Sequence, residues 1–147
     1  MPQENMAGNL YVDIVSPHGS VFRGDAQGVK APGVQGAFEV LFNHAPMIAA
    51  FDIGPLVIVE PSGQEILFAT SGGFLEVLNN TVTVLAETAE PSSAIDVERA
   101  KAAEARALER LHRLEGAERE RAQRALERAR NRLRVAMGRV GTRVSSS

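Results

Sequence analysis

Arginine side chains are concentrated near the end of this 147-residue chain. Residues 117–139 contain eight arginines and three glutamates, a net charge of +5. A helix would place four of these arginines on one face, because they are three or four residues apart. Guanidinium groups form paired hydrogen bonds with phosphates and carboxylates, which indicates an anion site, although a solvated helix face is an equally good interpretation. The four arginines are Arg121, Arg124, Arg128 and Arg132.

A second dense group of polar residues runs from Glu90 to Ala100. Asp96 stands where the N-cap of a helix would be, and Arg99 follows one turn later as its local ion partner. A helix start is therefore the simplest interpretation of this segment. The backbone amides at such an N-terminus would still be available to an anion or to a ring-nitrogen acceptor.

Catalytic and metal-binding patterns are missing from the sequence. The three histidines, His18, His44 and His112, have no metal-ligand spacing, and there is no cysteine. Neither a nucleotide-binding P-loop nor a G-x-S-x-G nucleophile motif is present. Residues 71–73, Ser-Gly-Gly, are more typical of a bulge or turn than of a phosphate cradle. We therefore expect a binding and regulatory protein without a metal site or a required cofactor, and not an enzyme.

Short segments with alternating polarity fill the first ninety residues, and turn signals rich in Gly, Pro and Asn separate them. Seven or more strands spaced by about ten residues predict an antiparallel β-sandwich or flattened barrel over residues 1–90. The predicted strands are Leu10–Val15, Ala37–Phe42, Met47–Phe51, Leu56–Glu60, Glu65–Thr70, Phe74–Leu78 and Thr81–Ala86.

After residue 90 the hydrophobic period changes to that of a helix. Two helices, from about Val97 to a stop at Gly116 and from about Ala117 to Met137, predict an antiparallel hairpin over residues 91–140. Its apolar stripes are mostly alanine, which buries little surface, so we expect a marginally stable and movable element. Residues 141–147 are predicted to be a disordered tail. The stripes are Ala100, Ala103, Ala107, Leu111 and Leu114 in the first helix and Ala122, Ala125, Leu126, Ala129, Leu133, Ala136 and Val140 in the second.

The two halves carry opposite charge. Residues 1–90 have a net charge of −8 and residues 91–147 a net charge of +6, which indicates separate surfaces with separate partners and a cationic hairpin able to fold onto an anionic body. No stretch approaches the length of a transmembrane helix, and residues 1–9 lack the pattern of a signal peptide. We expect a cytoplasmic protein without direct membrane insertion.

Five segments, in order and spacing, resemble the epsilon subunit of the bacterial F-type ATP synthase. They are Val15–Pro17, Asn43–Pro46, Ala69–Val77, Thr81–Ala86 and the Ile95-Asp96-x-x-Arg99-Ala100 motif. The resemblance implies a non-catalytic rotor subunit of the central stalk, at the cytoplasmic face of the bacterial membrane. It implies contacts of the β domain with the gamma subunit and the c-subunit ring. It further implies a mobile hairpin whose basic face (Arg121, Arg124, Arg128 and Arg132) meets the alpha and beta subunits and inhibits ATP hydrolysis.

The same resemblance implies a regulatory ATP site in the folded hairpin. In this sequence the carboxylates Glu90 and Asp96 would accept from the base or ribose, and Arg128 and Arg132 would neutralise phosphates. The full set of matching residues is Glu90, Ile95, Asp96, Arg99, Ala100, Arg106, Arg128 and Arg132.

One departure concerns the rotor contact. Many members of the family have Gly-Glu-Leu-Gly before the His-Ala-Pro turn, whereas residues 36–39 here are Gly-Ala-Phe-Glu. Ala37 stands at the position of the family's glutamate, and Glu39 is two residues further along the same strand face. Glu39 and His44 are therefore the candidate rotor contacts. Two other classes stay open: a purely structural coupling subunit that binds no nucleotide, and a nucleic-acid-binding protein that uses the basic helix, which the acidic body and few aromatics disfavour.

Overall fold

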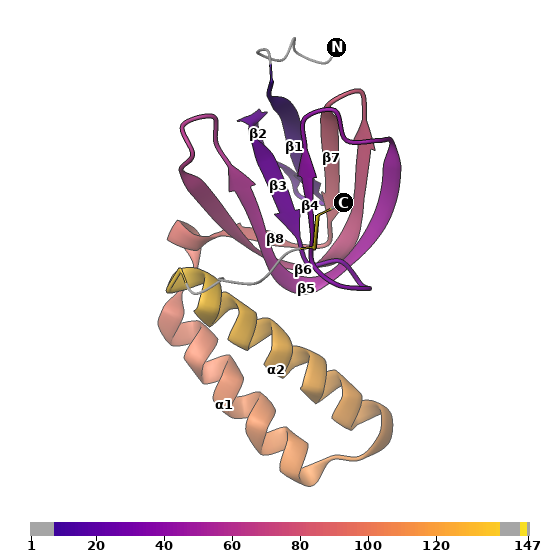
Figure 1. Cartoon of the computed structure of the whole chain (residues 1–147). Coiled ribbons are helices and arrows are strands. Elements are labelled where there is room, and N and C mark those ends of the chain that lie inside the picture. Colours follow the sequence, from indigo (N-terminus) through magenta and orange to yellow (C-terminus); the bar gives the residue numbers. More distant parts are fainter. Residues whose placement is uncertain (1–7, 139–144, 147) are drawn as a thin grey trace.

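The computed structural model describes residues 8–138 and 145–146. They form a β domain and a helical hairpin that lies at one end of it (Figure 1). The hydrogen-bonded strand order is β2-β1-β7-β6-β5-β3-β4-β9, with β8 paired to β6. The elements are β1 (Leu10–Ser16), β2 (Gly19–Ala26), β3 (Gly28–Ala31), β4 (Phe38–Leu41), β5 (Met47–Val59), β6 (Glu65–Leu78), β7 (Thr81–Ala86), β8 (Ala89–Pro91), the 3₁₀ turn η1 (Ser92–Ala94), α1 (Val97–Arg113), α2 (Gly116–Ala136) and β9 (Ser145–Ser146).

Two long strands, β5 and β6, connect both layers of the β domain. They pair along their whole length except opposite Asp52, where the ladder is interrupted. The first half of β5 and the second half of β6 continue into β7, β1 and β2, whereas the other halves carry β3, β4 and β8. The sequence prediction divided each of these strands into two, and that division is wrong. Gly54, Gly72 and Gly73 allow the chain to bend here without ending the strand.

Among strands β1 to β8, one pair departs from the predicted antiparallel sheet. β1 and β7 run parallel, with Val12 opposite Val82 and Ile14 opposite Val84. About 65 residues separate these strands in sequence, so no tight turn forces an antiparallel pairing. β2 and β3, which were not among the seven predicted strands, complete the two layers by pairing with β1 and with β4 and β5, respectively.

The core lies between the two layers and follows the predicted alternation. In the second half of β6, Leu75 and Val77 are buried while Phe74, Glu76 and Leu78 face outward. The predicted inward face of β1 is likewise buried. The largest fully buried side chains include Leu10, Val12, Ile14, Leu56, Ile58, Phe68 and Val84.

The helical hairpin is formed largely as predicted. Asp96 caps α1, because its carboxylate accepts a hydrogen bond from the backbone N–H of Arg99 at 3.0 Å. Gly116, predicted as the stop between the helices, is instead the first residue of α2 and adopts a φ of +63°. Alanine dominates the seam, in which Ala100, Ala107, Ala122 and Ala129 are buried. α1 packs mainly on α2, and α2 packs on β5 and β6.

The ends of the predicted domains differ slightly from the elements observed. The predicted boundary at residue 90 falls inside β8, which precedes η1 and the hairpin. Val140 and most of the predicted disordered tail lie outside the described residues. Within that tail, Ser145–Ser146 form β9, a short strand parallel to β4, where no strand was predicted.

The bend in β6 depends on Gly73, which we expect to tolerate no side chain. Its φ is +152°, and a Cβ there would stand 2.0 Å from the carbonyl oxygen of Leu85. Gly73→Ala should therefore lower the free energy of unfolding of the β domain by at least about 2 kcal/mol. Urea denaturation followed by the fluorescence of Tyr11, the single tyrosine, measures this loss. Gly63→Ala is the matched control, since its φ is also positive (+92°) but nothing lies within 4 Å. Equal stability of the two variants would contradict the close approach.

Candidate functional site

A buried side-chain amide of α2 is hydrogen-bonded to β5 and β6 at their bend. Asn131 is 2% exposed, and its Nδ2 donates to the carbonyl oxygens of Gly54 at 2.9 Å and Thr70 at 3.3 Å. The hydroxyl of Thr70 also donates to Gly54 O, at 3.0 Å. These contacts join the hairpin to both long strands at the point where the strands bend.

Two ion pairs hold α2 on either side of this amide. Arg124 Nη2 lies 2.8 Å from Asp52 Oδ1, and Arg132 Nε lies 2.6 Å from Glu90 Oε1. The hydrogen bond from Arg124, followed by one from the backbone N–H of Ile53, lowers the pKa of Asp52 below its ordinary value. The same hydrogen bond raises the pKa of Arg124. Both pairs join the basic helix to the acidic body, as the charge asymmetry predicted.

A polar cavity of about 390 Å³ opens where the β domain meets the start of α1. Six of the eight residues that the resemblance assigned to ATP line it. The two lining residues that sequence reasoning missed are Ala94 and Ala103, whose small side chains carry no chemical signal. The cavity is lined by Glu90, Ala94, Asp96, Arg99, Ala100, Ala103, Arg106 and Arg132.

The chemistry of this cavity suits an anion with polar groups. Arg99 and Arg106 are exposed along α1, so their guanidinium groups are accessible to a ligand. Arg132 faces them from α2 but already pairs with Glu90. Oδ1 of Asp96 caps the helix by accepting from the Arg99 N–H, which leaves the second carboxylate oxygen to accept a hydrogen bond from a ligand. Three cations and two carboxylates therefore surround a space open to solvent, at the N-terminus of a helix.

Arg128 and Ile95 are not among the residues that line this cavity. Ile95 ends η1, where its N–H donates to Ser92 O at 3.4 Å. Arg128 lies one turn before Arg132 and borders a small cavity of about 10 Å³ together with Asn131, Thr70 and Arg132. Arg128 and Arg132 are four residues apart on one face of α2 and both border this small cavity, whereas only Arg132 also lines the larger one.

The four arginines of the predicted basic face of α2 border different hollows. Arg121, Arg124 and Arg128 border one open hollow of about 460 Å³. Arg124 is engaged by Asp52, whereas Arg132 points into the polar cavity. With the hairpin docked against β5 and β6, Arg124 and Arg132 of this face are therefore paired with carboxylates of the β domain.

Glu39 and His44 lie elsewhere on the β domain. Glu39 stands on β4 opposite Lys30 of β3. His44 belongs to the turn between β4 and β5, and its Nδ1 lies 2.8 Å from Ala45 O. Asn43 fixes this turn, since its N–H donates to the side-chain oxygen of Asn80 at 2.6 Å. Asn80 follows β6 at the end of the sandwich where β1 begins, away from the hairpin (Figure 1).

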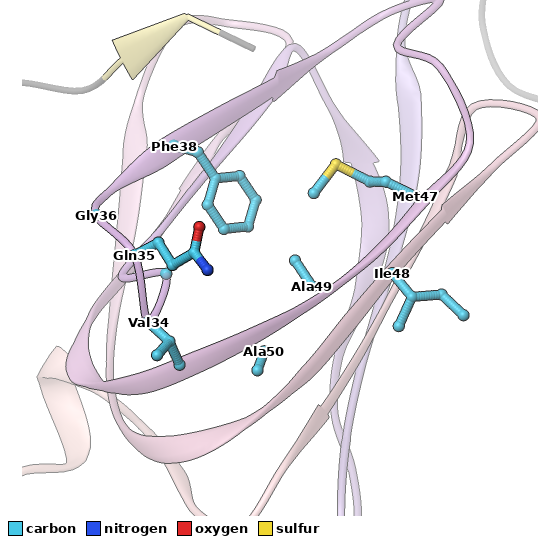
Figure 2. Close-up of a pocket in the computed structure, with 9 residues that line it drawn as sticks. Val34, Gln35, Gly36, Phe38, Met47, Ile48, Ala49 and Ala50 are labelled. Carbon is cyan, nitrogen blue, oxygen red and sulfur yellow. The ribbon is translucent and has the colours of Figure 1, made fainter.

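A pocket of about 510 Å³ lies beside the turn in which the family's glutamate is replaced. Figure 2 shows Phe38 and Met47 pointing into it, while Ile48 points away. Gly33, Val34, Gln35 and Gly36 form its rim. The lining is mostly apolar, so the surface at this turn differs in character from one that carries a carboxylate.

The outer surface of the layer that contains β6 and β7 carries large exposed apolar side chains, three of which are more than half exposed. Ile48 is 72% exposed, Phe74 58% and Leu85 55%. Phe74 and Leu85 are direct cross-strand neighbours. We call these three residues the outer apolar face. Contiguous exposed apolar side chains are typical of a protein-binding surface.

Neither a metal centre nor a membrane-spanning helix was found in the part of the chain that the structure describes. Within residues 8–138 and 145–146, no three histidine or carboxylate side chains cluster as metal ligands would. Over the same residues, neither helix has the length and hydropathy needed to cross a bilayer.

Comparisons with known proteins agree with this geometry along the chain. The family model for the ATP synthase delta/epsilon chain, beta-sandwich domain, matches residues 9–92, and that for the delta/epsilon chain, long alpha-helix domain, matches residues 93–137. The ATP synthase epsilon chain of Salinibacter ruber is 61% identical over 149 residues, covering 95% of this chain and the full length of the relative. That of Desulfitobacterium hafniense is 45% identical, covering 67% of this chain and 74% of the relative.

Solved structures show the same fold at much lower identity. A chain of the Euglena gracilis mitochondrial ATP synthase, in an OSCP/F1/c-ring structure, matches with a TM-score of 0.77 at 20% identity, covering 89% of this chain and 83% of that one. A chain of the Tetrahymena thermophila enzyme, from its central stalk and c-ring, matches with a TM-score of 0.55 at 14% identity, covering 91% and 99%. Because the family models and the Salinibacter relative span almost the whole chain, it belongs to the ATP synthase epsilon chain family and is a non-catalytic subunit, as its motifs predicted.

Proposed function

We propose that this chain is a rotor subunit of the central stalk, at the cytoplasmic face of the bacterial membrane, whose β domain binds the gamma subunit and the c-subunit ring. The outer apolar face is the candidate surface for the gamma subunit, because its three large side chains are exposed and the hairpin does not cover them. Glu39, His44 and the apolar pocket beside Ala37 are the candidate surface for the ring. Coupling proton flow to rotation requires such contacts and no chemistry within this chain.

We also propose that the hairpin is an inhibitory element, and that bound ATP stabilises its docked, non-inhibitory state. The single observation that carries this proposal is the cavity of about 390 Å³, in which six of the predicted residues meet between α1, α2 and the β domain. A nucleotide bound there would contact all three parts at once. It would bind the docked hairpin and not the released one, which is the condition for a sensor.

The free energy that ATP binding can contribute is comparable to the free energy that holds the hairpin on the β domain. An alanine seam contributes little burial, and exposed ion pairs contribute roughly 0–1 kcal/mol each. A ligand at a concentration a hundredfold above its Kd contributes about 2.7 kcal/mol to the state that binds it. Low ATP would then release the hairpin, and the arginines of α2 would become available to the acidic loops of the alpha and beta subunits.

The pair between Arg132 and Glu90 sets a condition on this proposal. At 2.6 Å it already neutralises Arg132, the residue that α2 contributes to the lining of the cavity. A phosphate must compete with Glu90 or share Arg132 with it. A strong pair would leave the chain a purely structural coupling subunit, so the affinity for ATP decides between the two functions.

ATP affinity tests the cavity directly. We expect Arg106→Ala and Arg132→Ala each to weaken ATP binding by at least tenfold, because each removes a charge-assisted hydrogen bond. Isothermal titration of the full chain measures this. Arg134→Ala is the control, since this exposed arginine of α2 does not line the cavity. Arg128→Ala should have a smaller effect than Arg132→Ala. No binding to the unsubstituted chain at millimolar ATP would remove the sensor and leave the structural role.

Docking of the hairpin should weaken in acid. The pKa of Asp52 is lowered in the docked state, so that state binds fewer protons than the released one. The ion pair of Asp52 with Arg124 therefore stabilises the docked state at pH values above the ordinary pKa of 3.8. This stabilisation is lost as the pH falls below that value. The loss should be modest, because both partners are nearly half exposed. A distance between labels on the hairpin and the β domain measures docking as the pH falls. In Asp52→Asn this component should be absent, and an unchanged profile would contradict the role of the pair.

Binding to the gamma subunit tests the outer apolar face. Phe74→Asp places a charge at the centre of that face, next to Leu85, and should weaken binding to isolated gamma subunit by at least about tenfold. The β domain should remain folded, because Phe74 is 58% exposed. Leu108→Asp is the control, an exposed apolar residue of α1 that lies off this face. If both variants bound gamma equally well, the interface would have to lie elsewhere.

A further inference from the structure

The alanine seam of the hairpin cannot by itself determine where α2 sits on the β domain. The seam joins α1 to α2, which pack mainly on each other, so the hairpin as a whole could slide along β5 and β6 without changing the seam. Ion pairs between half-exposed side chains are also tolerant, because long arginines follow a shifted partner. Some other contact must select one register.

Asn131 has the properties that such a contact needs. Asn131 and Thr70 are the two buried polar residues among those described, and they are joined at the same point. The Asn131 amide donates to two carbonyl oxygens, on β5 and on β6. A one-turn shift would bring Glu127, Arg128, Arg134 or Val135 to this position, and none of them offers an uncharged donor of the same length.

We infer that Asn131 is the positioning residue that fixes the register of α2 on the β domain and thereby brings Arg124 to Asp52 and Arg132 to Glu90 at the wall of the polar cavity. A buried polar group is known to select one register among similar apolar packings. Arg124 precedes Asn131 by seven residues, and Arg132 follows it directly, so one fixed point aligns both. The consequence for nucleotide rests on the proposed ATP function, whereas the register itself does not.

The same residue keeps the docked state reversible. Asn131 Oδ1 is buried and, within the described part of the chain, has no hydrogen-bond partner. An unsatisfied buried acceptor offsets part of what the amide donor contributes. Asn131 therefore contributes more to the choice of register than to the strength of docking, which suits an element that must be released.

The test uses the full chain with two labels. Because the chain contains no cysteine, spin labels attach only at the engineered pair Ser62→Cys and Glu115→Cys, on an exposed turn of the β domain and at the tip of the hairpin. Asn131→Leu keeps the branched shape and the number of heavy atoms of the side chain and removes the donors. We expect a broadened distance distribution and a fall of at least about tenfold in the ratio of docked to released hairpin. Asn131→Asp should release more, since a carboxylate would face two carbonyl oxygens. Gln123→Leu, at an exposed amide of the same helix, should change nothing. A single unshifted distance in Asn131→Leu would overturn the inference.

A double-mutant cycle separates positioning from simple packing. If Asn131 aligns the ion pairs, Arg124→Ala should cost docking much less in the Asn131→Leu background than in the original chain. Additive effects would mean that Asn131 only fills space, and would overturn the inference even if Asn131→Leu weakened the fold. Tyr11 fluorescence reports whether the β domain stays intact. If the original chain failed to bind ATP while the label distances shifted as expected, the sensor would be excluded and the positioning role would stand.

Discussion

The bend shared by β5 and β6 is the constraint on which the rest of the structure depends. Two strands of 13 and 14 residues serve both layers of the sandwich only because they turn at Gly54 and at Gly72–Gly73. A Cβ at Gly54 would stand 2.5 Å from Pro32, and one at Gly73 would meet the backbone of β7. The bend also presents two carbonyl oxygens to the hairpin. The glycines therefore determine the sandwich and the seat of α2 together.

The hairpin is held by few contacts, and each has a distinct character. The alanine seam contributes weak and unspecific packing, and the ion pairs attract a basic helix to an acidic β domain. The amide of Asn131 fixes the position of α2 along β5 and β6. One arginine, Arg132, belongs both to an ion pair and to the polar cavity. Docking and ligand binding are therefore linked through a shared side chain, and no additional relay between them is required.

The sequence predicted the elements with strong periodicity and missed those set by tertiary pairing. The inward faces of β1, the end of β6 and β7 follow from alternation, and the N-cap at Asp96 follows from its side chain. The continuity of β5 and β6 could not be predicted, because Gly54-Pro55 and Gly72–Gly73 are local signals of a turn. The parallel pairing of β1 with β7 depends on contacts distant in sequence. β2 and β3 have weak intrinsic preferences that their neighbours override.

The same distinction applies to the candidate site. The family resemblance assigned Glu90, Asp96, Arg99, Arg106 and Arg132 to one site, and the structure places them around one cavity. Arg128 was assigned with them, and in the structure it borders a small neighbouring cavity that Glu90 and Arg132 also line. Asn131 gave no signal at all, since an asparagine among exposed arginines is indistinguishable from a solvated residue until its two carbonyl partners are known.

Hydrogen exchange of the backbone amides, with and without ATP, most directly tests whether the hairpin is a separable unit that nucleotide holds on the bend. Amides of α1 and α2 should exchange through a local opening that leaves the β domain protected, and millimolar ATP should slow them several-fold without changing the sandwich. Exchange of hairpin and sandwich in a single opening, unaffected by ATP, would contradict a movable hairpin held by nucleotide.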